Sequence, residues 1–151
     1  MAVNLNWLEL HYKGTIFSKK NSKQIISVHG KPMIVSNSRA KKNEREMANE
    51  FALQVMQHRW HPRGSYSVSM YFWRKDNVRR DLDNLATSVL DALVLAGALE
   101  DDNINNVHEL HIYDVGVNKE LAGVSVHLEG ETYEEEEWTK QLKTSTKQRR
   151  K

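Results

Sequence analysis

Apolar and polar residues alternate with a period of two in several parts of the chain, and this pattern predicts β-strands. The predicted strands are 5–12, 25–28, 33–35, 65–73, 107–113 and 122–128, of which 65–73 alternates most cleanly. Gly30 and Pro32 join the second and third segments as a hairpin, and we expect the last two segments to pair as a hairpin as well. The residues expected on the buried sides of the first and fourth strands are Leu8, Leu10, Tyr12, Tyr66, Val68, Met70 and Phe72.

Two other segments repeat apolar residues every three or four positions, which predicts helices over about 37–58 and 82–96. Pro62 and Gly64 are expected to end the first helix, and Gly97 to follow the second as its C′ residue. The apolar faces are expected to contain Met47, Ala48, Phe51, Ala52, Val55 and Met56 in the first helix, and Leu82, Leu85, Ala86, Val89, Leu90 and Leu93 in the second. The opposite side of the second helix carries Asp83, Thr87 and Asp91.

These elements predict an α+β fold that contains a small mixed sheet and two main helices, in the order β-β-β-α-β-α-β-β. A chain of 151 residues is long enough for one domain with a modest core. We expect this domain to span residues 1–128. Beyond Glu129 the apolar periodicity is lost, so we expect residues 129–151 to form a charged C-terminal tail that is helical or disordered.

The composition excludes several classes of protein. The chain has no cysteine, so it forms no disulfide, iron–sulfur cluster or thiolate zinc site, and this fits a reducing cytoplasm. No apolar run approaches the length of a membrane span, and the N-terminus lacks the apolar stretch of a signal peptide. We therefore expect a cytoplasmic protein without a membrane partner.

Charge is distributed unevenly along the chain, although the net charge is only +2. Residues 1–80 contain 15 Lys and Arg against 5 Asp and Glu, residues 81–139 contain one Lys against 15 acids, and residues 140–151 add 6 basic residues. A basic half and an acidic half on one domain indicate a phosphate-binding surface around a metal-binding pocket. The alternative is a segregation of charge that has no function.

The clearest chemical signal is the run Arg-Arg-Asp-Leu-Asp-Asn over 79–84, which is followed after the second helix by an acidic cluster over 100–102. Carboxylates are the ligands that Mg²⁺ prefers, and the ion keeps waters that can supply an attacking hydroxide. Neighbouring arginines would hold the phosphate that the carboxylates repel. The structural alternative is that Asp81 caps the helix, that Asp83 complements the helix dipole, and that 100–102 is a solvated loop.

The same residues resemble the RusA family of Holliday junction resolvases. The resemblance rests on Asp-Leu-Asp-Asn-Leu at 81–85, Leu-Asp-Ala-Leu at 90–93, Ala-Gly at 96–97, Asp-Asp at 101–102 and, more weakly, the polar segment 18–22. It extends over residues 5–128.

The resemblance implies an intertwined homodimer that uses Mg²⁺, or Mn²⁺ in its place, to cut four-way DNA junctions by paired nicks in recombination and repair. It assigns catalysis and metal binding to Asp81, Asp83 and Asp102, with the neighbouring Asp101 as a further candidate ligand. The residues expected to bind DNA are Lys19, Lys20, Asn21, Lys23, Arg74, Lys75, Arg79 and Arg80. Such a protein is expected in the cytoplasm of a bacterium or of a phage-infected cell.

The chain departs from the family at Thr87, where the family commonly has a catalytic lysine. Thr87 cannot supply positive charge to the developing phosphorane, so Lys75, Arg79 or Arg80 would have to replace that lysine. The departure leaves open a DNA-junction binding protein with weak or lost cleavage, and a nuclease that prefers flaps or forks also remains open. A D-x-D enzyme for nucleotide phosphates would require a Gly-rich phosphate loop, and the sequence has none.

The position of the third aspartate raises a question of geometry. A helix over 83–96 advances about 20 Å at ~1.5 Å per residue. Residues 97–102 can return at most about 20 Å if they are fully extended. Asp102 therefore joins Asp81 and Asp83 within one chain only if this loop runs straight back. Otherwise it serves a site that is shared with the partner subunit.

Overall fold

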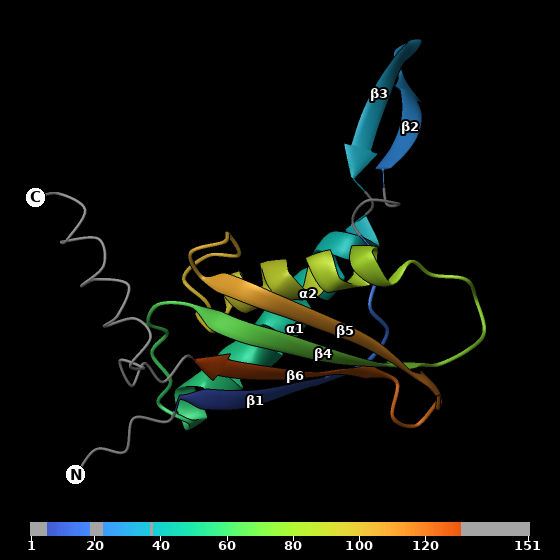
Figure 1. Ribbon diagram of the computed structural model, residues 1–151. Coiled ribbons are helices and arrows are strands. Elements are labelled where there is room, and N and C mark those ends of the chain that lie inside the picture. Colours follow the sequence, from blue (N-terminus) through green and yellow to red (C-terminus); the bar gives the residue numbers. More distant parts are fainter. Residues whose placement is uncertain (1–5, 19–22, 37, 131–151) are drawn as a thin grey trace, which may run out of the picture.

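The computed structural model describes residues 6–18, 23–36 and 38–130, which form a four-stranded sheet, two helices and a separate two-stranded ribbon (Figure 1). The elements in chain order are β1 Trp7–Lys13, β2 Lys23–Val28, β3 Lys31–Ser36, α1 Ser38–Gln57, β4 Tyr66–Arg74, α2 Leu82–Leu95, β5 Val107–Val117 and β6 Gly123–Gly130. The predicted α+β class, the mixed sheet and the order of elements are confirmed. Of the predicted tail, residues 131–151 lie outside the described residues.

The four-stranded sheet has the strand order β1-β6-β4-β5, in which β6 is antiparallel to both of its neighbours and β5 is parallel to β4. The prediction that 107–113 and 122–128 pair as a hairpin was therefore wrong. The connection through α2 brings β5 back parallel to β4, and the following turn then crosses the end of β4, where Asn118 N donates to Arg74 O at 2.8 Å. Consequently β6 enters the sheet on the other side of β4.

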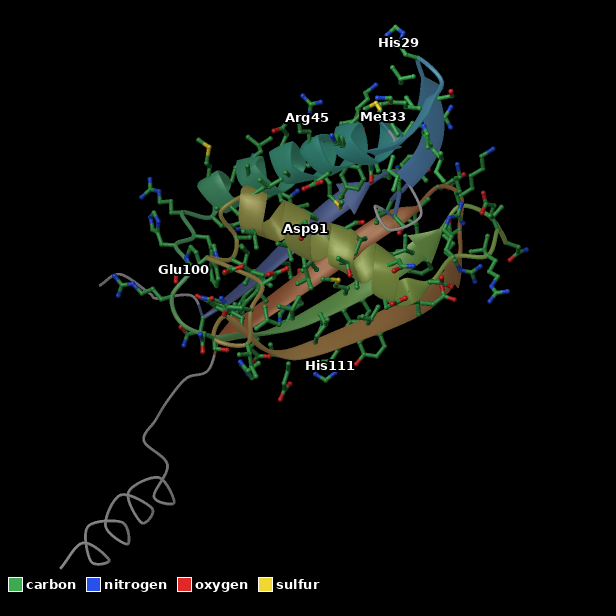
Figure 2. All side chains as sticks on the ribbon, turned by 90° about the horizontal axis from the view of Figure 1, so that it is seen from above. His29, Met33, Arg45, Asp91, Glu100 and His111 are labelled. Atoms are coloured by element: carbon green, nitrogen blue, oxygen red, sulfur yellow. The ribbon has the colours of Figure 1, made fainter. Side chains whose placement is uncertain are left out.

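Both helices lie on the same face of this sheet and enclose the core against it (Figures 1 and 2). The predicted inward side chains of β1 and β4 are buried, as are most of the predicted apolar residues of the two helices. Ala52, Leu82 and Leu90 are partly buried, and Met56 is 74% exposed. The buried stripe of α1 instead follows Met47, Ala48, Phe51 and Val55, so the next residue, Met56, faces outward. Neither helix in the described part of the chain is long and apolar enough to cross a membrane.

The two helices end in the same way but with different residues. After α2, Gly97 adopts a left-handed φ of 76°, and Ala98 N donates to Leu93 O, as predicted for a glycine at C′. After α1, Arg59 takes the equivalent place with φ 51°, and Trp60 N donates to Val55 O. The first helix therefore ends before Pro62 and Gly64, which the sequence predicted as its stop. Trp60 is buried, and its indole Nε1 donates to Ala98 O at 3.0 Å, which ties the two helix ends together.

The outer edge of β1 is partly blocked by a side chain of α1. Gln54 Nε2 donates to His11 O at 2.7 Å, and Gln54 Oε1 accepts from His11 N at 2.8 Å. The side-chain amide thus makes the two hydrogen bonds that the backbone of a neighbouring strand would make, and it protects this part of an otherwise unpaired edge. The opposite edge of the sheet is formed by β5, the longest of the described strands, and no strand among the described residues pairs with its outer side.

Candidate active site

The first two predicted metal ligands lie at the N-terminus of α2. Asp81 is the N-cap residue, with an extended backbone (φ −92°, ψ 120°), but its side chain makes no capping hydrogen bond. Instead Asp81 Oδ2 accepts from Nδ2 of the buried Asn84 at 3.4 Å. Asp83 is exposed in the first helical turn. The capping explanation for Asp81 thus lacks its hydrogen bond, although the negative charge of this carboxylate is favourable at the N-terminus of a helix.

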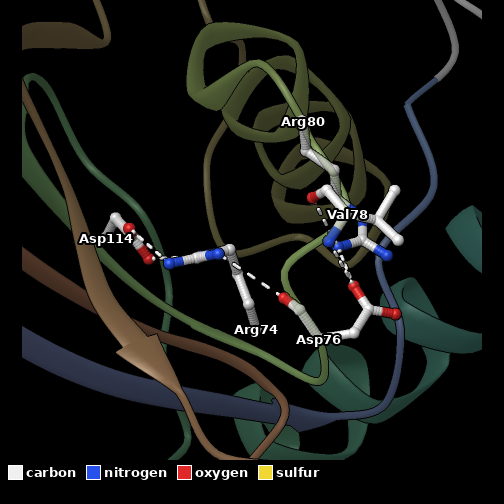
Figure 3. Close-up of polar contacts among 5 residues, drawn as sticks. All are labelled: Arg74, Asp76, Val78, Arg80 and Asp114. Carbon is white, nitrogen blue, oxygen red and sulfur yellow. Dashed lines mark hydrogen bonds and ion pairs between the residues drawn. The ribbon is translucent and has the colours of Figure 1, made fainter.

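The loop that leads into Asp81 is organised by two arginine–carboxylate pairs (Figure 3). Arg74 donates twice to Asp114 of β5, from Nε at 2.9 Å and from Nη2 at 3.1 Å. Arg80 Nη1 donates to Asp76 Oδ1 at 2.7 Å and to Val78 O at 3.2 Å. The same Asp76 oxygen accepts from Val78 N at 3.1 Å, which closes a turn within the loop. Arg74 and Arg80 are therefore held in place in the free protein.

These hydrogen bonds shift the pKa values of Asp76, Asp114 and Arg74. The hydrogen bond from Arg80 lowers the pKa of Asp76 below its ordinary value, and the hydrogen bond from Arg74 lowers the pKa of Asp114. The bond to Asp114 in turn raises the pKa of Arg74. The lowered pKa values favour the charged carboxylates of Asp76 and Asp114.

Between this loop and the sheet lies a small cavity of about 30 Å³, next to Leu85 at the start of α2. Its cationic lining comes from Arg74, Lys75 and Arg80. A space of this size holds about one water, so a single phosphate oxygen fits it better than a whole nucleotide. Lys75 and Arg79 are exposed, and within the described part of the chain neither forms an ion pair. They are the two cations of this loop that a phosphate can approach without breaking an existing pair.

The other predicted acidic residues lie beyond the opposite end of α2. Figure 2 shows Asp91 along the helix and Glu100 past its C-terminus. Asp101 accepts hydrogen bonds from Asp102 N at 2.7 Å and from Asn103 Nδ2 at 2.9 Å, so its carboxylate is used to order the loop. Partial burial, followed by the hydrogen bond and charge of Asp101 and by the charge of Asp91, raises the pKa of Asp102.

The structure therefore does not bring the three predicted aspartates together within one chain. Among residues 6–18, 23–36 and 38–130, no three Asp, Glu or His side chains form a cluster that could hold a metal ion. Asp81 and Asp83 form one half of the predicted site, and Asp102 lies near Asp91, at the other end of the helix. Mg²⁺ is commonly held by one or two carboxylates together with substrate phosphate and water, so the donors at the start of α2 suit this ion.

The residue at the position of the family lysine makes only a backbone contact. Thr87 Oγ1 donates to Asp83 O at 2.9 Å, one helical turn back. It brings no charge to the side of α2 that carries Asp83. Among the described residues, the segment that precedes the helix contains the cations Arg74, Lys75, Arg79 and Arg80.

Several predicted DNA-binding residues cannot be placed. Lys19, Lys20 and Asn21 lie outside the described residues, and so does the side chain of Lys23. Conversely, sequence reasoning missed Asp76 and Asp114. The signal for Asp76 was a single acid within the basic run 74–80, whereas no local signal links Asp114 to Arg74.

Comparison with known protein families finds a match over most of the chain. A family model described as "Endodeoxyribonuclease RusA" matches residues 15–129, which contain the ribbon, both helices and β4 to β6. Strand β1 precedes the matched region, although the resemblance seen in the sequence extended to residue 5. No curated protein matches the chain. Because the matched region includes most of the chain, together with both acidic segments, the protein belongs to the RusA family of endodeoxyribonucleases.

Proposed function

We propose that the protein is a metal-dependent resolvase that cuts four-way DNA junctions by paired nicks, with Mg²⁺ as its ion and Mn²⁺ as an effective replacement. The observation that carries this proposal is the Asp81 carboxylate. It lies at the N-terminus of α2, makes no capping hydrogen bond, and directly follows an arginine that is fixed by its own loop. A D-x-D that served only to start a helix would not need this arrangement.

Each part of this end of the molecule has a role in the proposed reaction. Asp81 and Asp83 would hold the ion, which when bound would lower the pKa of water and stabilise charge that develops on phosphate. Lys75 and Arg79 are exposed and bind the flanking phosphates. Arg80, oriented by Asp76, stabilises negative charge on the phosphate at the cleaved bond.

We propose further that the site is completed by a second subunit. In one chain Asp102 lies beyond the far end of α2, so this carboxylate joins Asp81 and Asp83 only if it comes from a second subunit. A two-fold axis that pairs β5 with its own copy in antiparallel fashion also makes the two α2 helices antiparallel, because α2 connects the parallel strands β4 and β5. The N-terminus of one helix, with Asp81 and Asp83, then faces the partner subunit's Asp102.

The exposed side chains on this edge support the same pairing. The unpaired β5 presents Leu110, Tyr113, Val115 and Val117 to solvent, and the loop that carries Asp102 presents Ile104. A long apolar edge strand is a template for pairing with another strand. Because Gln54 already blocks part of the β1 edge, β5 is the edge that a second copy can extend.

A second candidate function follows from Thr87. Because its hydroxyl is bonded to the helix backbone and no cation replaces the family lysine on α2, the protein could bind junctions and cut them only weakly. A DNA-junction binding protein of this kind would keep the salt-dependent affinity of the resolvase and lose most of its turnover.

The direct test uses a synthetic four-way junction and a linear duplex of the same sequence, each with Mg²⁺ or EDTA. We expect symmetric nicks in the junction that require the metal, and little cutting of the duplex. Asp81→Asn and Asp83→Asn should abolish the nicks and keep junction affinity, whereas the remote exposed carboxylate variant Glu50→Gln should cut like the wild type. Tight junction binding without nicks in the wild type would select the second candidate, and equal cutting of duplex and junction would contradict the resolvase.

A further inference from the structure

The two-stranded ribbon of β2 and β3 stands apart from the body of the protein. Figure 1 shows it rising beyond the N-terminal ends of the helices, away from the four-stranded sheet. Its strands pair with each other from Lys23↔Ser36 to Val28↔Lys31. The turn is formed by His29 and Gly30, both with positive φ (52° and 76°), which is typical of a tight hairpin turn that matches the twist of the strands. We call residues 23–36 the arm.

The arm exposes apolar side chains on both of its faces. Ile25 and Ile34 are cross-strand partners on one face and are 76% and 71% exposed. Ile26 and Met33 are partners on the other face and are 39% and 48% exposed. A lone two-stranded hairpin is only marginally stable in water. Apolar side chains that stay exposed to solvent contribute no burial free energy to its stability. The exposed apolar side chains therefore indicate that the arm is buried against a binding partner.

The segment that precedes the arm, residues 15–17, is held against both helices near the end of α2 that carries Asp81 and Asp83. The buried Asn43 of α1 accepts from Phe17 N at 3.0 Å and donates to Thr15 O at 2.7 Å. Ser88 Oγ, also buried, bonds to Phe17 O at 3.2 Å and to Asn84 O at 3.3 Å. The same Asn84 contacts Asp81, so the segment that precedes the arm and the proposed metal ligand Asp81 share one small set of hydrogen bonds.

The positive charge of the sequence around the arm indicates which partner the arm binds. From Leu10 to Asn43 the chain contains no Asp or Glu. The basic residues in this stretch are Lys13, Lys19, Lys20, Lys23, Lys31, Arg39, Lys41 and Lys42. Two such arms repel each other, whereas a polyanion attracts them. An element that is basic, apolar on both faces and adjacent to a nuclease site fits nucleic acid better than it fits a second arm.

We propose that the arm binds DNA at the branch point of the junction and inserts its apolar side chains where base stacking is interrupted. The proposal rests on the proposed function, and it assigns recognition of the branched substrate to the arm. A two-stranded ribbon fits a DNA groove, and proteins use Ile, Met and Pro as wedges between base steps. In a continuous duplex every base step is stacked, so insertion of a side chain costs the free energy of unstacking. The arm therefore binds branched DNA more tightly than linear DNA.

The test places the fluorescent base 2-aminopurine at the branch point and keeps EDTA present, so that no strand is cut. The arm variant Ile25→Ser/Ile34→Ser is compared with the control Leu53→Ser/Met56→Ser, which removes two exposed apolar side chains from α1. We expect wild type and control to raise the fluorescence on binding, and the arm variant to bind about tenfold more weakly without this rise. Lys31→Gln should lower the slope of log affinity against log salt by about one.

Sedimentation of the same proteins separates the other outcomes. If the arm variant dissociates into a smaller species while the control does not, a second copy of the chain covers the arm and the proposal is overturned. An unchanged fluorescence rise in the arm variant would also overturn it, with the proposed function intact. A wild-type protein that binds the junction no better than linear duplex would instead defeat the proposed function, and the arm proposal with it.

Discussion

Asp76 accepts a hydrogen bond of 2.7 Å from Arg80, the residue that directly precedes the proposed metal ligand Asp81. One oxygen of Asp76 also accepts from Val78 N, so this carboxylate fixes both the turn and the arginine. We infer that Asp76 positions Arg80 for the phosphate, and that it does not bind the metal itself.

Removal of this carboxylate should therefore slow the reaction. We expect Asp76→Ala to lower the single-turnover cleavage rate on the order of tenfold to a hundredfold, because Arg80 is no longer aligned. Asp76→Asn keeps an acceptor for Val78 N and should recover part of the rate. The exposed neighbour provides the control, since Asn77→Ala should cut like the wild type. Equal rates for Asp76→Ala and Asn77→Ala would show that the loop needs no such support.

The pair formed by Arg74 and Asp114 should make stability depend on pH in a defined direction. The arginine lowers the pKa of Asp114, so the folded state favours the charged carboxylate. The contribution of this pair to the free energy of unfolding is fully present above the ordinary Asp pKa of about 3.9. It is lost as the pH falls through the lower pKa that Asp114 has in the folded state. Asp114→Asn should therefore melt below the wild type at pH 7, and the two melting temperatures should converge in strong acid. A difference that grows as the pH falls would contradict this assignment.

Much of the fold was predictable because its signals are local. The alternation of Tyr66, Val68, Met70 and Phe72 marks a strand wherever that strand pairs, and Gly97 marks a helix end by its own conformation. Pairing between strands is different, because it depends on segments far apart in the sequence. Consecutive strands usually pair, so the last two were expected to do so, and nothing near either of them shows that β4 lies between them.

The candidate site also contains residues that were predictable from local sequence and residues that were not. The run that contains Asp81 and Asp83 was visible in the sequence, because its residues are adjacent. The partner of Arg74 was not, since Asp114 reaches it only through the parallel register of β4 and β5. The length of α2 already raised the question of whether Asp102 can return to the other two. The structure places Asp102 near Asp91, in agreement with a site that needs a second subunit.

Restoring the family lysine should accelerate cleavage. Thr87 lies one turn after Asp83 on the same side of α2, so Thr87→Lys places a positive charge close to the proposed metal ligand. We expect the cleavage rate to rise by roughly ten- to a hundredfold, because a cation stabilises charge in the transition state. Thr87→Met is the control of similar length without charge. An unchanged rate in Thr87→Lys would show that Lys75, Arg79 or Arg80 already supplies this charge.

The most direct test of the account is complementation between two inactive variants, Asp81→Asn and Asp102→Asn. If the proposed site takes Asp81 from one chain and Asp102 from the other, a mixed dimer contains one doubly altered site and one intact site. Each variant alone should therefore leave a four-way junction uncut in Mg²⁺. Their mixture, after subunit exchange, should nick one strand of each junction that a mixed dimer binds. A mixture that exchanges subunits and still leaves every junction uncut would contradict the shared site and place all three aspartates within one chain.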